Sequence, residues 1–238
     1  MPFTEEVRAR LDADADAIIG KYPGARSALL PLLHLVQAEE GYVSQDGVDY
    51  CAGKLGLTKT EVTGVVSFYT MYKRELAGEY SVGVCTNALC AVLGGDQIYA
   101  DVQEHLGFDG DDHHGAAPTT PDGKVTLERI ECNAACDYAP VVMVNWEYFD
   151  NQTPQSAKQL VDDLRAGQPV RPTRGPSHLC TWREASRILA GFNDDQATDG
   201  PAAGTASLAG LRIAKEHDWS APGPGNPGPG NSVPGGQP

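Results

Sequence analysis

The sequence predicts an α+β protein with a helical bundle at its N-terminus, an α/β domain in its middle and a Gly/Pro-rich tail at its C-terminus. Three observations lead to this prediction. Apolar residues recur at helical spacing in the first part of the chain, apolar strand patterns alternate with helix patterns in the middle, and glycine and proline dominate the end. We expect the three regions to span residues 1–76, 77–176 and 177–238.

Composition limits the compartment and the partners that we expect. The chain has 238 residues, enough for one large core and a smaller second one, and its six cysteines are too few for a disulfide-dense secreted scaffold. No apolar run near the N-terminus resembles a signal peptide, and no window approaches the about 18 apolar residues of a membrane span. The formal net charge of -14 argues against nucleic acid as a partner, since nucleic-acid binders carry clustered Lys and Arg. We therefore expect a cytoplasmic protein that reaches a membrane only through a partner.

The N-terminal bundle is predicted from four amphipathic helices. Apolar residues recur at helical spacing over residues 4–20, 27–40, 45–55 and 59–66. Gly56 ends the third helix, and Thr58 and Glu61 have the spacing of a capping box for the fourth. Residues 55–62 also look like a helix-turn-helix, but Lys59 is the only base-reading cation that the second helix offers. We therefore set DNA binding aside.

Strands and helices alternate in the middle region. Strands are predicted over residues 80–84, 125–130 and 141–146, and helices over residues 95–106 and 153–166. The order strand, helix, strand, strand, helix is that of a thioredoxin-like domain, whose strands share one sheet. From residue 177 onward we expect an extended, largely irregular tail, in which the apolar residues 208–214 could dock on a partner.

Four cysteines lie in two short loops, and each loop follows a predicted strand. The loops are Cys85-Thr-Asn-Ala-Leu-Cys90 and Cys132-Asn-Ala-Ala-Cys136. Thiolates are the soft ligands that iron and zinc prefer, and four of them suit either one zinc ion or one binuclear iron site. The sequence therefore predicts a metal or cluster site.

Three types of cysteine site compete for this pattern. A disulfide exchanger needs C-x-x-C with one thiolate at a helix N-terminus, and neither loop has that spacing. Structural zinc usually shows C-x2-C, whereas these spacers are four and three residues, so zinc remains the weaker alternative. A [2Fe-2S] cluster fits better, because small or polar residues between the ligands let backbone N–H groups approach its sulfurs. We expect Cys51 to be a buried inert thiol and both Cys51 and Cys180 to be dispensable for the cluster.

The sequence resembles the 24 kDa subunit family of NADH-quinone oxidoreductase, respiratory complex I, over about residues 5–175. The motifs that carry the resemblance are the two cysteine loops, Val84-Cys-Thr-Asn87, Glu131-Cys132, Ala139-Pro140, Val144-Asn145, Gly41-Tyr42 and Val65-Val-Ser-Phe-Tyr69. One departure is visible: the family commonly has Leu-Gly after the third cysteine, where this chain has Asn133-Ala134. The substitution leaves ligation intact and places a methyl group near the cluster.

The resemblance implies a helical bundle followed by a thioredoxin-like domain that binds one [2Fe-2S] cluster through Cys85, Cys90, Cys132 and Cys136. It implies docking on a flavoprotein subunit that carries FMN and NADH, contact with the large iron-sulfur subunit of complex I, and one-electron exchange with FMN. The protein would then be a subunit of proton-translocating NADH:quinone oxidoreductase with no catalytic residue for hydride transfer, peripheral on the cytoplasmic face of the inner membrane. The alternatives are the equivalent subunit of an NAD-linked formate dehydrogenase or hydrogenase, and a free thioredoxin-like ferredoxin.

Overall fold

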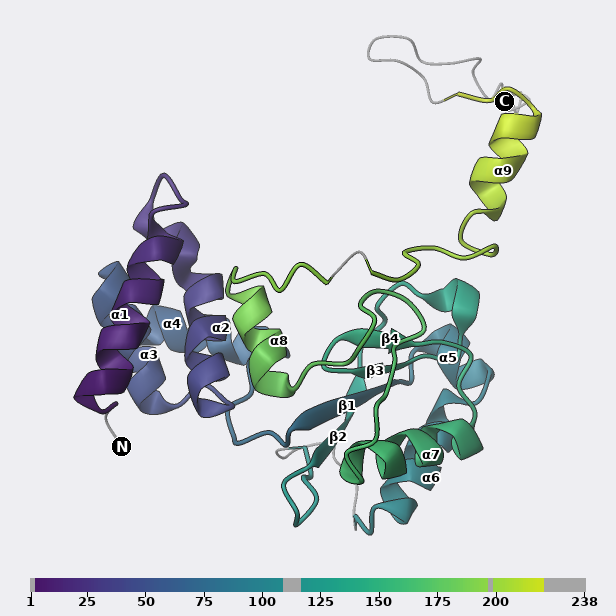
Figure 1. Cartoon of the computed structure of the whole chain (residues 1–238), viewed down its shortest axis with the longest axis horizontal. Coiled ribbons are helices and arrows are strands. Elements are labelled where there is room, and N and C mark those ends of the chain that lie inside the picture. The colour runs from purple at the N-terminus through teal and green to yellow at the C-terminus, as the bar shows by residue number, and fades with distance from the viewer. Residues whose placement is uncertain (1–2, 109–116, 197–198, 221–238) are drawn as a thin grey trace, which may run out of the picture. The chain divides into compact units, whose positions relative to one another are not determined.

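The computed structural model describes residues 3–108, 117–196 and 199–220. The chain divides into two compact units, residues 1–202 and 203–238. Within the described residues, no helix is both long enough and apolar enough to cross a lipid bilayer. The first unit contains the helices and the sheet that the sequence predicts, so the α+β fold class is confirmed (Figure 1).

Four helices form the N-terminal bundle, as expected. They are α1 (Glu5–Ile19), α2 (Leu29–Glu40), α3 (Gln45–Leu55) and α4 (Lys59–Phe68), with a 3-10 turn at Ala25–Ala28 before α2. Threonine or serine side chains accept hydrogen bonds from the first turns of α1, α3 and α4, and α4 has the expected capping box of Thr58 and Glu61. Helix α2 is buried on nearly all sides and packs against α1 and α3, so it forms the centre of this core.

The middle region forms one four-stranded sheet in the order β2-β1-β3-β4. The strands are β1 (Tyr80–Cys85), β2 (Val125–Ile130), β3 (Val142–Val144) and β4 (Glu147–Phe149). Strands β1 and β2 are parallel, whereas β3 is antiparallel to both of its neighbours. Helices α6 (Gly95–His105) and α7 (Pro154–Arg165) pack their apolar side chains against Val82, Val84 and Leu127 on one face of the sheet. The cysteine loops pack on the opposite face of the sheet, where Cys90 and Ala135 cluster with Ile130 and Met143.

Two of the short elements in this region, β4 and α5, are not predicted from the sequence. The expected strand 141–146 ends earlier, because Asn145 and Trp146 both have positive φ and turn the chain back into β4. Tryptophan is not a typical residue for such a turn, so the sequence indicates the turn only weakly. The buried side chain of Asn145 stabilises the turn by accepting from the Ser81 backbone N–H at 2.8 Å. The second new element is the short helix α5 (Ala88–Val92), which contains Cys90.

Part of the expected irregular tail is an ordered helix of the first unit. Helix α8 (Trp182–Leu189) packs against α2, and Trp182 is 1% exposed and donates to the Gly41 carbonyl at 2.9 Å. Thr181 and Glu184 form a capping box, which is the sequence signal that could have revealed this helix. The second unit contains α9 (Ala209–Glu216), which buries none of its residues, and residues 221–238 lie outside the described part of the chain.

Candidate metal-cluster site

The first cysteine loop leaves the sheet at the end of β1 and runs into α5. Cys85 is the last residue of β1 and Cys90 lies on α5, and both are buried. Gly95, at the start of α6, lies directly against this loop. A Cβ at Gly95 would lie 2.9 Å from the Cys90 carbonyl oxygen and closer still to that of Cys85. The close approach of α6 to both cysteines therefore requires glycine at this position.

The second loop follows β2 and is more exposed. The sulfur atoms of Cys132 and Cys136 lie 3.6 Å apart, and both residues are solvent-exposed. The backbone N–H of Ala134 donates to Cys132 Sγ at 3.4 Å. Ala134 has φ of 57°, a left-handed conformation that disfavours a Cβ. The second loop therefore holds an alanine in a conformation that suits glycine better.

The parallel pairing of β1 and β2 brings the two loops together. Cys85 pairs in register with Ile130, so both strands end at the same edge of the sheet. The Asn87 side chain also reaches the Ile130 carbonyl, at 3.5 Å. One cavity at this edge is lined by all four predicted site residues and three neighbours, namely Cys85, Cys90, Cys132, Cys136, Asn133, Ala135 and Val141. The structure therefore brings together two loops that lie far apart in the sequence.

The donor set fits a binuclear cluster, because the cavity is lined by two pairs of cysteines. Two thiolates on one metal, with metal–sulfur bonds of about 2.3 Å and tetrahedral angles, lie about 3.7 Å apart, close to the spacing of Cys132 and Cys136. A [2Fe-2S] cluster places two thiolates on each of two irons, so it needs two separate pairs around one cavity.

Two thiols of this site, those of Cys85 and Cys136, have a raised pKa in the absence of a metal. Burial raises the pKa of Cys85 to about 11, with further contributions from the neighbouring thiols and a partly opposing hydrogen bond from the Asn87 backbone. The pKa of Cys136 is raised first by its hydrogen bond with Cys132. A metal must therefore displace the protons of these thiols when it binds, as thiolate sites require.

The two remaining cysteines do not line the cavity. Cys51 lies in the core of the helical bundle, where burial raises its pKa to about 12. Cys180 lies before α8, and its carbonyl accepts a hydrogen bond from the Asn145 side chain at 2.8 Å. That neither takes part in the site stays a prediction.

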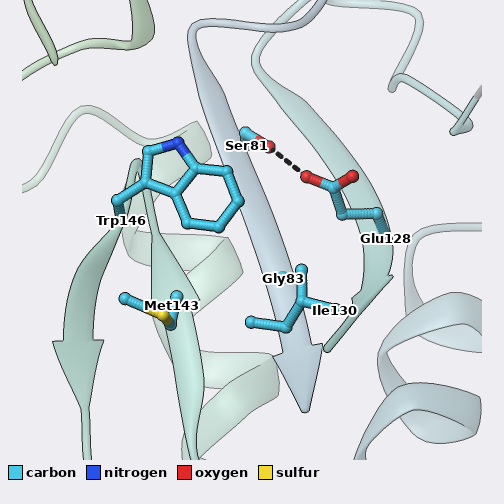
Figure 2. A pocket seen from close by; sticks show the side chains of 6 residues that line it. All are labelled: Ser81, Gly83, Glu128, Ile130, Met143 and Trp146. Atoms are coloured by element: carbon cyan, nitrogen blue, oxygen red, sulfur yellow. Dashed lines mark hydrogen bonds between the residues drawn. The ribbon is translucent and has the colours of Figure 1, made fainter. Parts of the chain in front are cut away.

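A second cavity lies on the same face of the sheet as the cysteine loops. Its lining comes from three strands and the turn after β3, and consists of Ser81, Gly83, Glu128, Ile130, Met143 and Trp146 (Figure 2). Ser81 donates to Glu128 at 2.8 Å, as the figure shows. Lys73, which precedes β1, forms an ion pair with the same carboxylate. The sequence analysis singled out none of these polar residues.

Comparison with known proteins agrees with this geometry. The sequence matches the family described as thioredoxin-like [2Fe-2S] ferredoxin over residues 15–165. It is 58% identical over 223 residues to a subunit of the NADH-quinone oxidoreductase of Mycobacterium tuberculosis, in an alignment that covers 92% of this chain and 85% of the relative. It is 37% identical over 159 residues to NADH-quinone oxidoreductase subunit 2 of Thermus thermophilus, in an alignment that covers 66% of this chain and 84% of the relative.

One solved structure of an NAD+-reducing [NiFe]-hydrogenase, in the air-oxidized state, is also similar. Its TM-score is 0.50 at 14% sequence identity, over 58% of this chain and 23% of that chain. At this level of identity the likeness concerns the fold alone.

Proposed function

The protein belongs to the thioredoxin-like [2Fe-2S] ferredoxin family and, within it, to the NADH-quinone oxidoreductase subunits represented by its Mycobacterium tuberculosis relative. From this premise we propose that Cys85, Cys90, Cys132 and Cys136 bind its [2Fe-2S] cluster. The single observation that carries the assignment is that all four cysteines line one cavity. The cluster accepts and returns one electron at a time when it is bound.

The residues of this chain have three tasks at such a site. The first loop supplies a buried pair of thiols, and the second supplies an exposed pair. The apolar side chains of Ala135 and Val141 are buried beside the sulfurs and limit access of water. The Ala134 N–H already donates to Cys132 Sγ, and this hydrogen bond favours the added negative charge of a reduced site.

We propose that electrons enter and leave the site on its exposed side. Because Cys132 and Cys136 are open to solvent while Cys85 and Cys90 are buried, a partner can approach from the second loop. We propose that this partner is the FMN- and NADH-binding flavoprotein subunit of complex I, and that the large iron-sulfur subunit is a further neighbour. In this proposal hydride transfer takes place on the flavoprotein, and single electrons pass between FMN and the site on this chain. The assembled enzyme is a proton-translocating NADH:quinone oxidoreductase, with this subunit on the cytoplasmic face of the inner membrane.

A second candidate function follows from the fold. The similarity to an NAD+-reducing hydrogenase is compatible with the equivalent subunit of an NAD-linked hydrogenase or formate dehydrogenase. The high identity to the Mycobacterium tuberculosis relative, over most of both sequences, favours the complex I assignment.

Single cysteine variants of the full-length chain test the cluster assignment. We expect Cys90→Ala and Cys136→Ala to lose the bound iron, since each leaves one iron with a single cysteine ligand. The matched controls Cys51→Ala and Cys180→Ala should retain about two irons per chain and the EPR signal of a reduced binuclear cluster. Retention of the cluster by both loop variants would refute the assignment.

Co-purification tests the partner. When the protein is isolated from cells that express it, we expect an FMN-containing protein to accompany it. Recovery of the cluster-loaded protein only as a lone monomer would favour the free ferredoxin instead.

A further inference from the structure

The second cysteine loop has less support of its own than the first. Cys85 and Cys90 are buried, whereas Cys132 and Cys136 are exposed. The second loop also includes a non-glycine residue in a left-handed conformation, Ala134. Its conformation therefore depends on contacts with residues outside the loop.

Two tyrosines supply such contacts. Tyr148 lies on β4, and its hydroxyl donates to the Asn133 carbonyl within the loop at 3.3 Å. Tyr138 follows Cys136 by two residues at the end of a short 3-10 helix (Cys136–Tyr138), and its carbonyl accepts from the Asn151 N–H at 2.8 Å. Tyr148 thus contacts the loop at Asn133, and Tyr138 lies two residues beyond the end of the loop.

A single guanidinium group contacts both tyrosine rings. The Arg174 guanidinium carbon lies 4.3 Å from the ring centroid of Tyr148 and 5.3 Å from that of Tyr138. An Arg174 nitrogen lies 2.8 Å from the Asp150 carboxylate, and the two side chains are 16% and 9% exposed. The cation is therefore neutralised and largely shielded from water, and its planar faces are available to the rings.

The position of Arg174 is determined by the sheet and not by the loop. The neighbouring Thr173 donates its backbone N–H to the Tyr148 carbonyl at 2.8 Å and its hydroxyl to Asp150 at 2.8 Å. Gly175 has φ of 89°, and a Cβ there would lie 2.9 Å from the Glu147 carboxylate, so the backbone runs close beside β4. Arg174 is therefore held in place by β4, and its contacts with the two tyrosine rings restrain the loop.

We infer that Arg174 is a positioning residue, which acts through Tyr138 and Tyr148 to hold the second cysteine loop in its ligand-binding conformation. This inference rests on the proposed function, in which that loop supplies Cys132 and Cys136 to the cluster. Lysine cannot replace the arginine, because a compact ammonium group cannot keep two ring contacts together with the ion pair to Asp150.

Two variants test the inference on the full-length, cluster-loaded protein. Arg174→Lys keeps the charge and removes the stacking plane, whereas Tyr148→Phe keeps the ring and removes only the bond to Asn133. The matched control is Arg165→Lys, because Arg165 pairs with Asp122 at the surface and contacts neither tyrosine. Each protein is assayed for iron release to a chelator, for the EPR spectrum of its reduced state, and for hydrogen exchange of the loop amides.

We expect both variants to release iron about tenfold faster than the unmodified protein, the usual scale for residues that orient metal ligands. The g-values should shift and the amides of residues 133–138 should exchange faster, while the control stays unchanged. Normal release and an unchanged EPR spectrum in both variants would overturn the inference, even if the melting temperature fell. If Arg174→Lys does not fold, Tyr138→Leu replaces it, since that variant removes one of the two rings that Arg174 contacts. Absence of a binuclear signal from the unmodified protein would instead refute the proposed function.

Discussion

The ammonium group of Lys73 lies 2.6 Å from the carboxylate of Glu128, in an ion pair whose side chains are only 11% and 17% exposed. The indole rings of Trp146 and Trp182 lie within 5.9 Å and 5.5 Å of the same ammonium group. Lys73 belongs to the segment between α4 and β1, and Glu128 lies on β2. The pair therefore connects the helical bundle and α8 to the strand that leads into the second cysteine loop.

Removal of one partner of this pair should destabilise the fold. We expect Lys73→Met to lower the free energy of unfolding by about 1–3 kcal/mol, because Glu128, only 17% exposed, loses its counter-ion. The double variant Lys73→Met/Glu128→Gln should recover part of the loss. Lys59→Met, which breaks an exposed ion pair with Asp49, should change stability by less than about 1 kcal/mol. Urea unfolding measures all three, and equal effects at both lysines would contradict the prediction.

Gly95 should be required at the first cysteine loop. We expect Gly95→Ala to destabilise the protein by about 1–3 kcal/mol and to reduce its iron content, since a Cβ would overlap the carbonyls of Cys85 and Cys90. Gly64→Ala is the control, because Gly64 lies in α4 with no atom within 4 Å of an added Cβ. That substitution should stabilise the helix by up to about 1 kcal/mol. An iron assay and thermal unfolding distinguish the two outcomes.

Substitution of Ala134 by glycine should stabilise the protein, whereas the same substitution of an alanine within a helix should destabilise it. Ala134→Gly relieves a left-handed conformation and should stabilise the loop by about 0.5–1 kcal/mol. The reduction potential should stay the same, because the N–H bond to Cys132 is retained. Ala91→Gly in α5 should instead destabilise by about 1 kcal/mol. Calorimetry and redox titration provide the measurements, and destabilisation by Ala134→Gly would show that the turn is not strained.

Acid should destabilise the helical bundle through His34. The imidazole is 7% exposed against the Tyr72 ring, and burial lowers its pKa from 6.5 to about 4. His34 of the unfolded protein binds a proton below about pH 6.5, whereas His34 of the folded protein binds one only below about pH 4. The stability that the neutral, buried His34 contributes is therefore complete above about pH 6.5 and is lost as the pH falls from about 6.5 to about 4.

The loss amounts to about 3 kcal/mol of unfolding free energy. We expect His34→Leu to remove this part of the pH dependence. The measurement is the difference between the unfolding free energies of the unmodified protein and the variant, followed from about pH 6.5 to about pH 4. Effects common to both proteins, such as loss of iron in acid, cancel in that difference. A parallel decline in both proteins would contradict the assignment.

Truncation should separate the two parts of the expected C-terminal tail. A variant that ends at residue 202 retains α8 and should unfold at nearly the same temperature as the full-length protein. A variant that ends at residue 176 loses Trp182 from the core and the bond between Gln37 and Ser186, and should be at least about 3 kcal/mol less stable. Equal stability of the two truncated proteins would show that α8 contributes little.

Local interactions made much of this protein predictable from its sequence. The capping box of Thr58 and Glu61 and the helical spacing of apolar residues depend on positions three or four apart, so they can be read directly. The spacing within Cys85–Cys90 and Cys132–Cys136 excluded a disulfide exchanger for the same reason, since each spacer is a property of a few consecutive residues.

The tertiary structure alone decided which distant residues meet. Nothing near Arg174 in the sequence indicates that its guanidinium contacts Tyr138 and Tyr148, because that contact depends on how the backbone returns along β4. Helix α8 was likewise read as part of an irregular tail, because its stability comes from burial against α2. The sequence by itself determined the ligand types and their spacing, while packing between segments far apart in the chain determined where those ligands lie and what holds them there.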